Sequence, residues 1–257
     1  MTDAVPRLLR SSQKLLGFAF SFLIYYGLPF HQRALTQIYA PFIRPGDLCF
    51  DVGAHLGDRL RAWSRLGARV VALEPHPGMM NWLRRWYGQK SNIVLLEQAV
   101  SSRPGTATLW MSRLTPSIST ISQEWLSTVR QNRRFAASRW DEQISVSVTT
   151  LDDLIDQYGK PVFCKIDVEG AELDVLQGLS QPLQALSFEY IPAVIGTALG
   201  CIERLSQLGK YEYNWRVSEF PWLRSPEWLP SQEMAAQLQH MRPDGNSGDV
   251  YARLIRT

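Results

Sequence analysis

Two short stretches of this chain hold residue types that could bind a cofactor and perform acid–base chemistry. The first, residues 51–57 (Asp-Val-Gly-Ala-His-Leu-Gly), follows an apolar run. Its glycines, Gly53 and Gly57, allow a tight turn and let a ligand approach the main chain closely. Glu74 ends the next apolar run, roughly 20 residues beyond Asp51, where an acid can accept both hydroxyls of a ribose. Together these residues predict a site for an adenosine-bearing cofactor.

The spacing of the glycines indicates which cofactor to expect. A dinucleotide requires G-x-G-x-x-G, so that its pyrophosphate can sit on the N–H groups of a helix. The loop at 51–57 has neither that spacing nor a third glycine. S-adenosylmethionine has no phosphate and needs no such cradle, so we expect this cofactor and not NAD. The alternative is an ordinary strand-to-helix turn in which Asp51 only caps the helix.

The second stretch, residues 165–172, reads Lys-Ile-Asp-Val-Glu-Gly-Ala-Glu. Alternation along a strand places Lys165 and Asp167 on the same face. Such charges are costly in a core, so we expect them to face a polar site or solvent. We expect Asp167 to be functional, because it ends a strand beside the cofactor loop. Glu169 and Glu172 have a simpler alternative role, which is to favour the N-terminus of the next helix through its dipole, and we favour this role for Glu172.

The elements around these stretches alternate between buried strands and amphipathic helices. Strands are expected at 48–52, 69–74, 93–97, 162–168 and 185–191, with helices between them. This alternation indicates an α/β domain with a parallel sheet. Both functional stretches then lie at the carboxyl ends of strands, where ligands bind in open α/β sheets.

The middle of the chain departs from this alternation. Residues 106–110 and 144–150 alternate with period two, which is typical of strands exposed on one side. Between them lies a polar insertion, about 111–143, which we expect to cover the acceptor of the reaction, because long loops are usually lids or binding loops. In it, Trp125 or Trp140 would offer an apolar face, and Arg133 or Arg134 would contact an acidic group. We expect one domain at 46–257 and an N-terminal helical extension at 1–45.

Composition excludes several classes of protein. The chain has 257 residues, of which 27 are lysine or arginine and 24 are acidic, giving a net charge of +3. A dedicated nucleic-acid-binding protein is usually far more basic, so a nucleic-acid partner is not expected. Three cysteines exclude a disulfide scaffold and suggest a reducing compartment. The four histidines lack metal-ligand spacing, so no metal is expected.

The N-terminus carries an uncharged stretch at 15–30, preceded by Arg7, Arg10 and Lys14. It is shorter than the ~20 residues that span a bilayer, and no small-residue cleavage site of a signal peptide follows it. A helix packed on the domain, an interfacial helix and a signal remain as alternatives. We expect a cytoplasmic protein, with peripheral membrane contact through residues 7–30 if the helix is interfacial.

Six segments occur in an order that resembles the FkbM-type S-adenosylmethionine-dependent methyltransferase family. They read DVGAHLG, ALEPHP, EQAVSS, VTTLDDL, KIDVEGAELDVLQGL and SFEYIP, and span residues 46–192, with a weaker echo in GDVYARL. The resemblance implies the class I methyltransferase fold, a Rossmann-like, seven-stranded, mostly parallel sheet with helices on both faces. It also implies O-methylation of a hydroxyl on a sugar, a glycan or glycolipid, or a natural product.

The resemblance extends the set of site residues. His55 stands where the family usually has asparagine, and both side chains can form hydrogen bonds. Because an alcohol acceptor loses a proton, a base is required. Asp167 is the first candidate and Glu189 the second, while Lys165 would hold the carboxylate or the acceptor oxygen. The residues expected to bind the cofactor are Asp51, Gly53, Ala54, His55, Gly57, Glu74, Pro75, Gln98, Ala99 and Asp167.

Two other functions compete with this one. An RNA ribose methyltransferase is suggested by arginines near Trp125 and Trp140, since basic and aromatic residues together suit stacked bases. A non-catalytic, cofactor-binding module at a membrane is suggested only by the apolar N-terminal segment. The retained carboxylates argue against the module, and the low net charge argues against RNA.

Overall fold

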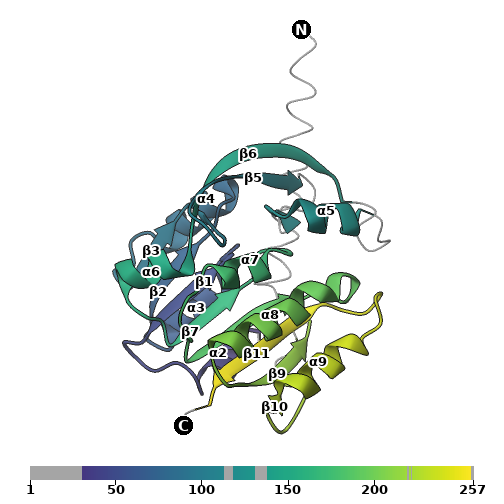
Figure 1. Ribbon diagram of the computed structural model, residues 1–257. Coiled ribbons are helices and arrows are strands. Elements are labelled where there is room, and N and C mark those ends of the chain that lie inside the picture. Colours follow the sequence, from purple (N-terminus) through teal and green to yellow (C-terminus); the bar gives the residue numbers. More distant parts are fainter. Residues whose placement is uncertain (1–30, 113–117, 131–137, 219, 221, 256–257) are drawn as a thin grey trace.

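The computed structural model describes residues 31–112, 118–130, 138–218, 220 and 222–255. Expectations that concern residues 1–30, Arg133 and Arg134 lie outside these ranges. The described chain forms a large sheet with strand order β10-β9-β11-β8-β7-β1-β2-β3 (Figure 1). A second sheet has the order β4 (Ala99–Val100), β6 (Trp140–Thr149), β5 (Gly105–Ser112). The strands of the large sheet are β1 (Leu48–Val52), β2 (Arg69–Leu73), β3 (Ile93–Leu96), β7 (Phe163–Ile166), β8 (Ala185–Tyr190), β9 (Tyr211–Val217), β10 (Leu229–Pro230) and β11 (Gly248–Leu254).

The five strands expected from apolar runs form the parallel part of this sheet. β3, β2, β1, β7 and β8 pair in parallel. β11 runs antiparallel and lies between β8 and β9. The expected seven strands are therefore present and mostly parallel, and the eighth, β10, is a two-residue strand paired with β9.

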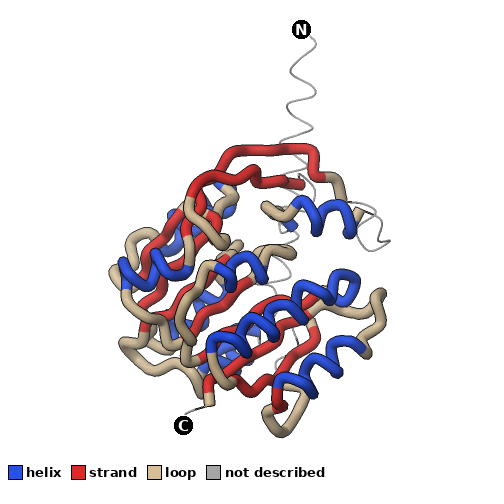
Figure 2. Tube along the Cα trace, viewed as in Figure 1, coloured by secondary structure: helices blue, strands red, loops and turns tan. Residues whose placement is uncertain are grey.

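Helices cover both faces of the large sheet (Figure 2). On one face α2 (His31–Tyr39), α3 (Asp58–Arg65) and α4 (Pro77–Tyr87) pack on an apolar cluster that includes Trp63 and Phe163. On the other, α6 (Leu151–Tyr158), α7 (Glu172–Gln177), α8 (Ile195–Leu208) and α9 (Ser231–Gln239) bury a larger cluster. The class I fold expected from the resemblance is confirmed.

Local sequence explains where several helices begin. Thr150 accepts the backbone N–H of Asp153, and the Asp153 side chain accepts the N–H of Thr150, which closes a capping box at the start of α6. His76 caps α4 by accepting the N–H of Gly78 on Nδ1, and Pro77 occupies the first helical position. These signals fix where the loops after β2 and β6 (Trp140–Thr149) end.

The second sheet crosses over one end of the large one (Figure 1). It contains β4 (Ala99–Val100), β5 (Gly105–Ser112) and β6, and α5 (Gln123–Val129) follows the short bridge between Trp110 and Thr120. The strands expected at 106–110 and 144–150 are confirmed as parts of β5 and β6, which pair antiparallel. The segment between β5 and α5 connects back to the large sheet, because Thr120 Oγ1 donates to the carbonyl of Glu169 at 2.7 Å.

The expected apolar face of Trp125 or Trp140 is wrong. Trp125 is 2% exposed and Trp140 6% exposed. The two rings meet edge to face, with centroids 5.7 Å apart, and pack with Leu126, Val129 and Ile191. They form a small hydrophobic core beneath α5, so neither indole offers a platform for a sugar or a stacked base.

The described residues include no helix that is long and apolar enough to cross a membrane. Cys49, Cys164 and Cys201 are buried free thiols. Burial in apolar surroundings raises a thiol's pKa and keeps it unreactive.

Candidate active site

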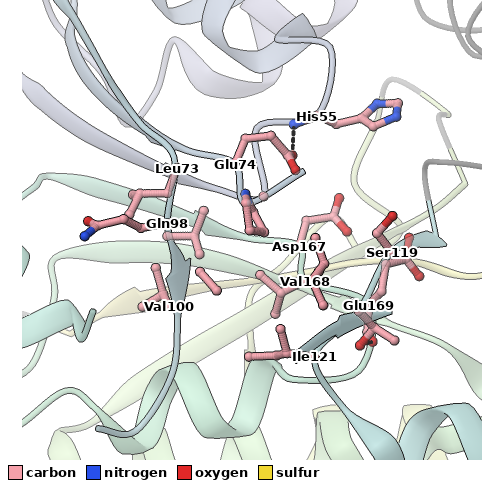
Figure 3. A pocket seen from close by; sticks show the side chains of 16 residues that line it. His55, Leu73, Glu74, Gln98, Val100, Ser119, Ile121, Asp167, Val168 and Glu169 are labelled. Carbon is pink, nitrogen blue, oxygen red and sulfur yellow. Dashed lines mark hydrogen bonds between the residues drawn. The ribbon is translucent and has the colours of Figure 1, made fainter. Parts of the chain in front are cut away.

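A pocket opens at the carboxyl ends of β1, β2 and β7, beneath the second sheet (Figure 3). It is partly open to solvent. Glu74 and Asp167 directly follow β2 and β7 of the large sheet. Leu109 belongs to β5 of the second sheet, and Ile121 lies between β5 and α5. Gln98 and Glu169 lie at opposite ends of the pocket (Figure 3). The pocket is thus formed jointly by the two sheets.

Glu74 links the two loops that shape this pocket. Its Oε2 accepts the backbone N–H of His55 at 2.8 Å, and its Oε1 accepts that of His76 at 2.8 Å. The side chain is buried, which raises its pKa to about 7, although the hydrogen bonds from the two backbone N–H groups act to lower it. Each carboxylate oxygen has a second lone pair, so Glu74 can accept further hydrogen bonds from neutral hydroxyl groups.

The loop after β1 turns through left-handed backbone conformations. Gly53 has a φ of 83°, His55 of 50° and Gly57 of 83°. Glycine adopts these angles without penalty, which explains the spacing of the two glycines. A Cβ on Gly57 would press on Leu83 and Tyr87 of α4, so this glycine permits close packing of the loop.

A second, smaller hollow adjoins the pocket. It is lined by residues that include Asp51, Ala54, Arg59 and Lys165, and it shares Gly53, His55 and Asp167 with the pocket. Asp51 is 2% exposed, and its Oδ2 has no hydrogen-bond partner among the described residues. Burial raises the pKa of Asp51 to about 7. The nearby charge of Asp58 also raises this pKa, whereas that of Arg59 lowers it. An orphaned acceptor of this kind fits a cationic ligand group.

The structure brings together nearly all of the expected cofactor residues. Glu74, Pro75, Gln98 and Ala99 line the larger pocket; Asp51 and Ala54 line the smaller; Gly53, His55 and Asp167 line both. Gly57 lines neither and instead begins α3. The buried polar atoms and glycine turns fit S-adenosylmethionine. Which of these residues touch it stays a prediction.

Lys165 and Asp167 do lie on one face, as strand alternation predicted: Lys165 Nζ is 2.9 Å from Asp167 Oδ2. Lys165 also faces a polar site, because it lines the smaller hollow, although its side chain is only 1% exposed. Its charge is tolerated because Asp249 Oδ1 also lies 2.9 Å from Nζ. Burial alone would lower the pKa of Lys165, but Asp167 and Asp249 outweigh it and raise the pKa.

Three carboxylates cluster beside the pocket. Oxygens of Asp167, Glu169 and Glu189 all lie within 4.8 Å of one another. Burial raises the pKa of Glu189 well above its usual value, and the nearby charges of Glu169, Asp167 and Glu172 raise it further. An all-oxygen set also suits a hard divalent cation; the sequence predicts no metal here.

Glu169, for which the sequence left a helix-dipole role as an alternative, joins this cluster. Its φ of 55° turns the chain sharply after β7. The Thr120 hydroxyl holds its carbonyl, and the next residue, Gly170, packs so closely on Trp125 that a Cβ would overlap the indole. The glycine at position 170 is a local signal for a turn after β7. No feature of the sequence indicates that this turn would contact Thr120 and Trp125.

Glu172 has a structural role, as expected, although by a different contact. Its Oε1 accepts the backbone N–H groups of Val168 at 3.1 Å and Gly170 at 3.2 Å. The carboxylate therefore closes the loop between β7 and α7. It is buried, not exposed at a helix end.

Comparison with known proteins agrees with this geometry. The family model for the methyltransferase FkbM domain matches residues 51–196. The 2-O-methyltransferase NoeI of Sinorhizobium fredii is 27% identical over 84% of this chain and 83% of its own. The hexuronic acid methyltransferase AglP of Haloferax volcanii is 28% identical over 55% of this chain and 54% of its own.

Solved structures with similar folds include a TehB-like S-adenosylmethionine-dependent methyltransferase from Corynebacterium glutamicum. It is 10% identical, with a TM-score of 0.48, and the match covers 95% of this chain and 99% of that one. A precorrin-6y C5,15-methyltransferase from Geobacter metallireducens is 11% identical, with a TM-score of 0.45 over 88% and 87% of the two chains. The family match covers more than half of the chain and includes both glycine and carboxylate stretches. The chain therefore belongs to the FkbM methyltransferase domain family and is an S-adenosylmethionine-dependent O-methyltransferase.

Proposed function

We propose that this enzyme methylates a hydroxyl of a sugar or glycan, and that Glu189 is the general base. The observation that carries the proposal is the cluster of Asp167, Glu169 and Glu189 beside the cofactor pocket. The names of the two curated relatives, a 2-O-methyltransferase and a hexuronic acid methyltransferase, support a sugar as the acceptor.

The contacts favour Glu189 over Asp167 as the base, which reverses the order expected from the sequence. Asp167 is engaged by the ammonium group of Lys165, which lies 2.9 Å from its Oδ2, so this carboxylate already has a charged partner. Glu189 Oε2 has no hydrogen-bond partner among the described residues, and the acidic neighbours raise its pKa. A carboxylate with a raised pKa takes a proton more readily.

We propose that Glu74 accepts the ribose hydroxyls of S-adenosylmethionine and that Asp51 faces its ammonium group. Gln98 and Ala99 line the same pocket at the side where the adenine would lie. When bound, the cofactor supplies an electrophilic methyl group on a sulfonium, which becomes a neutral thioether, so the acceptor hydroxyl must lose one proton. Glu189 would take this proton and release it to solvent, while Asp167 would orient the acceptor oxygen.

The RNA alternative loses its structural support in the described residues. Trp125 and Trp140 are buried in the core beneath α5, so they cannot stack on bases. Arg133 and Arg134 lie outside the described residues.

The test is transfer of a labelled methyl group from S-adenosylmethionine to three acceptor sets: neutral glycosides, glycosides of hexuronic acids, and RNA oligonucleotides. We expect label on a glycoside, in a linkage that resists mild alkali as an ether does. Label released by mild alkali would indicate a carboxyl ester and contradict hydroxyl methylation. Label on RNA alone would contradict the sugar acceptor.

We also propose, from the sequence alone, that residues 7–30 contact a membrane surface. Arg7, Arg10 and Lys14 would meet anionic headgroups, and the uncharged stretch at 15–30 would enter the interface. Flotation with anionic and with neutral liposomes tests this. We expect the full chain to float with anionic vesicles and a chain lacking residues 1–30 to remain in the dense fraction. Equal behaviour of the two chains would contradict membrane contact.

A further inference from the structure

Charged side chains from four elements meet beneath the two hollows of the site. Asp249 of β11 joins them, because its Oδ1 lies 2.9 Å from Lys165 Nζ. Its Oδ2 accepts from Arg216 of β9, at 2.7 Å from Nε and 2.6 Å from Nη2, and lies 3.8 Å from Nη2 of Arg59 on α3. One carboxylate thus faces three cations.

Strand register explains why residues so distant in sequence meet here. Asp249 pairs directly with Glu189 of β8 on one side and with Arg216 of β9 on the other. Lys165 pairs with Ser187, two residues before Glu189 on the same strand. Residues directly opposite one another in a sheet share a face, so all of these side chains emerge on the side covered by α2 and α3.

The cluster is almost free of solvent. The side chains of Lys165 and Arg216 are 1% exposed, and that of Asp249 is 5% exposed. Burial by itself would raise the pKa of Asp249, but Lys165, Arg216 and Arg59 outweigh it and hold the pKa far below its usual value. Asp249 is therefore a fixed anion at neutral pH.

Asp167 stands at the other end of this chain of contacts. Its side chain is 30% exposed and lines both hollows, whereas Lys165, which lines only the smaller hollow, is 1% exposed. The Lys165 ammonium group lies between one buried carboxylate and one that faces the site. A long lysine side chain has several rotatable bonds, so a second contact is needed to hold its ammonium group in one place.

We infer that Asp249 is a positioning residue for methyl transfer: it anchors the ammonium group of Lys165, which in turn holds the Asp167 carboxylate at the site. The inference rests on the proposed function, since it concerns the geometry of the acceptor side. Asp249 lies beyond residues 51–196, the segment that matches the family model. The machinery of the site thus extends into the antiparallel strand.

Three variants test the inference. Asp249→Asn removes the anchoring charge, but it leaves buried cations uncompensated and can impair folding. The double variant Asp249→Asn/Arg216→Met removes one charge of each sign, so the buried net charge stays the same. Glu212→Gln is the matched control, because Glu212 pairs with Arg253 across the same two strands, at an exposed position.

The first measurement needs no acceptor. Crystal structures of the wild type and the double variant, each with S-adenosylhomocysteine, compare the positions of Lys165 and Asp167. We expect the ammonium group to leave its place and the Asp167 carboxylate to shift relative to Glu189. If both side chains keep their wild-type positions, Asp249 has no positioning role and the inference is overturned.

The second measurement separates positioning from folding. We expect kcat to fall by about tenfold or more, since small misplacements in an active site can cost about 100-fold, while the cofactor Kd stays near the wild-type value. We also expect the loss of kcat at alkaline pH to begin at a lower pH in the variant than in the wild type. The reason is that Lys165 loses an acidic neighbour and deprotonates more easily. The charged groups facing Lys165 are Asp51, Asp167, Glu189, Asp249 and Arg59.

The outcomes are distinguishable from failure of the proposed function. A wild type that methylates no sugar overturns that function, while the crystallographic comparison still decides whether Asp249 positions Lys165. A double variant that folds and turns over like Glu212→Gln, with an unchanged pH profile, overturns the inference.

Discussion

Gly53 and Asp167 are in such close contact that a Cβ atom on Gly53 would overlap the carbonyl oxygen of Asp167. The N–H of Asp167 in turn donates to the carbonyl of Val52 at 2.9 Å. The loop after β1 therefore rests directly on the loop after β7. The cofactor loop and the first of the clustered carboxylates are positioned by one another.

This contact predicts that Gly53→Ala will separate the two loops. We expect cofactor affinity to fall by about tenfold or more, and the free energy of unfolding to drop by ~1–3 kcal/mol, because the strain combines a left-handed backbone with a backbone clash. Gly46→Ala is the control: its φ is also positive, at 87°, but nothing lies within 4 Å of an added Cβ. Equal effects of the two substitutions on calorimetric cofactor affinity would contradict a role for the contact.

Glu74→Gln should weaken cofactor binding by about 1.5–3 kcal/mol, since a charged acceptor of two hydroxyls becomes a neutral one. Burial raises the pKa of Glu74 to about 7. The charged form that binds hydroxyls best is therefore lost as the pH falls through 7, and wild-type affinity should decline from pH 8 to pH 6. Titration calorimetry at several pH values should show a flatter profile for the variant. A wild-type affinity independent of pH over this range would refute the assignment.

Glu189→Gln should lower kcat by ~10²–10⁴-fold, the usual contribution of a general base, and leave cofactor affinity unchanged. Asp167→Asn should lower kcat less. Because the base works when deprotonated and burial raises its pKa, the wild-type rate should rise with pH through that raised pKa. The exposed Glu233 provides a control in Glu233→Gln. If Asp167→Asn is the more damaging variant and Glu189→Gln keeps wild-type activity, Asp167 is the base.

The cofactor-free protein should become more stable as the pH is lowered from 8 to 6. Burial raises the pKa values of Asp51, Glu74 and Glu172 to about 7, so the folded state binds more protons than the unfolded state in this range. Stability then falls with rising pH. His55 acts in the opposite direction, since burial lowers its pKa to about 4, but Glu189, whose pKa burial raises, adds to the effect of the other three carboxyl groups. Thermal unfolding at pH 6, 7 and 8 measures how stability changes with pH, and Glu172→Gln should make this change smaller.

The parallel half of the fold was predictable because its signals are local. Apolar runs marked β1, β2, β3, β7 and β8, and the carboxyl end of each strand fixed where Asp51, Glu74 and Asp167 would gather. The capping box of α6 is also local, because Thr150 and Asp153 are three residues apart. Each of these features depends on residues within a few positions of one another.

What could not be predicted depends on pairing between distant segments. The place of β11 between β8 and β9 brings Asp249 to Lys165, and nothing near either residue in the sequence signals this. Trp125 and Trp140 lie in a polar stretch, yet they bury each other. The number of polar residues near each tryptophan predicts exposure, because it does not show that the two rings, from separate elements, pack against each other and exclude water.

The position of β11 also has a consequence for the order of folding during synthesis. β8 leaves the ribosome before β9, but β11 must enter between them and can do so only after both have been made. Asp249 is translated roughly 80 residues after Lys165, which at typical elongation rates is a delay of about 4–16 s. During this interval the nascent chain carries Arg59 and Lys165, and later also Arg216, without the anion that finally faces all three. We therefore expect the emerging domain to remain partly open until this late strand inserts, and to be most exposed to chaperones and proteases in that interval.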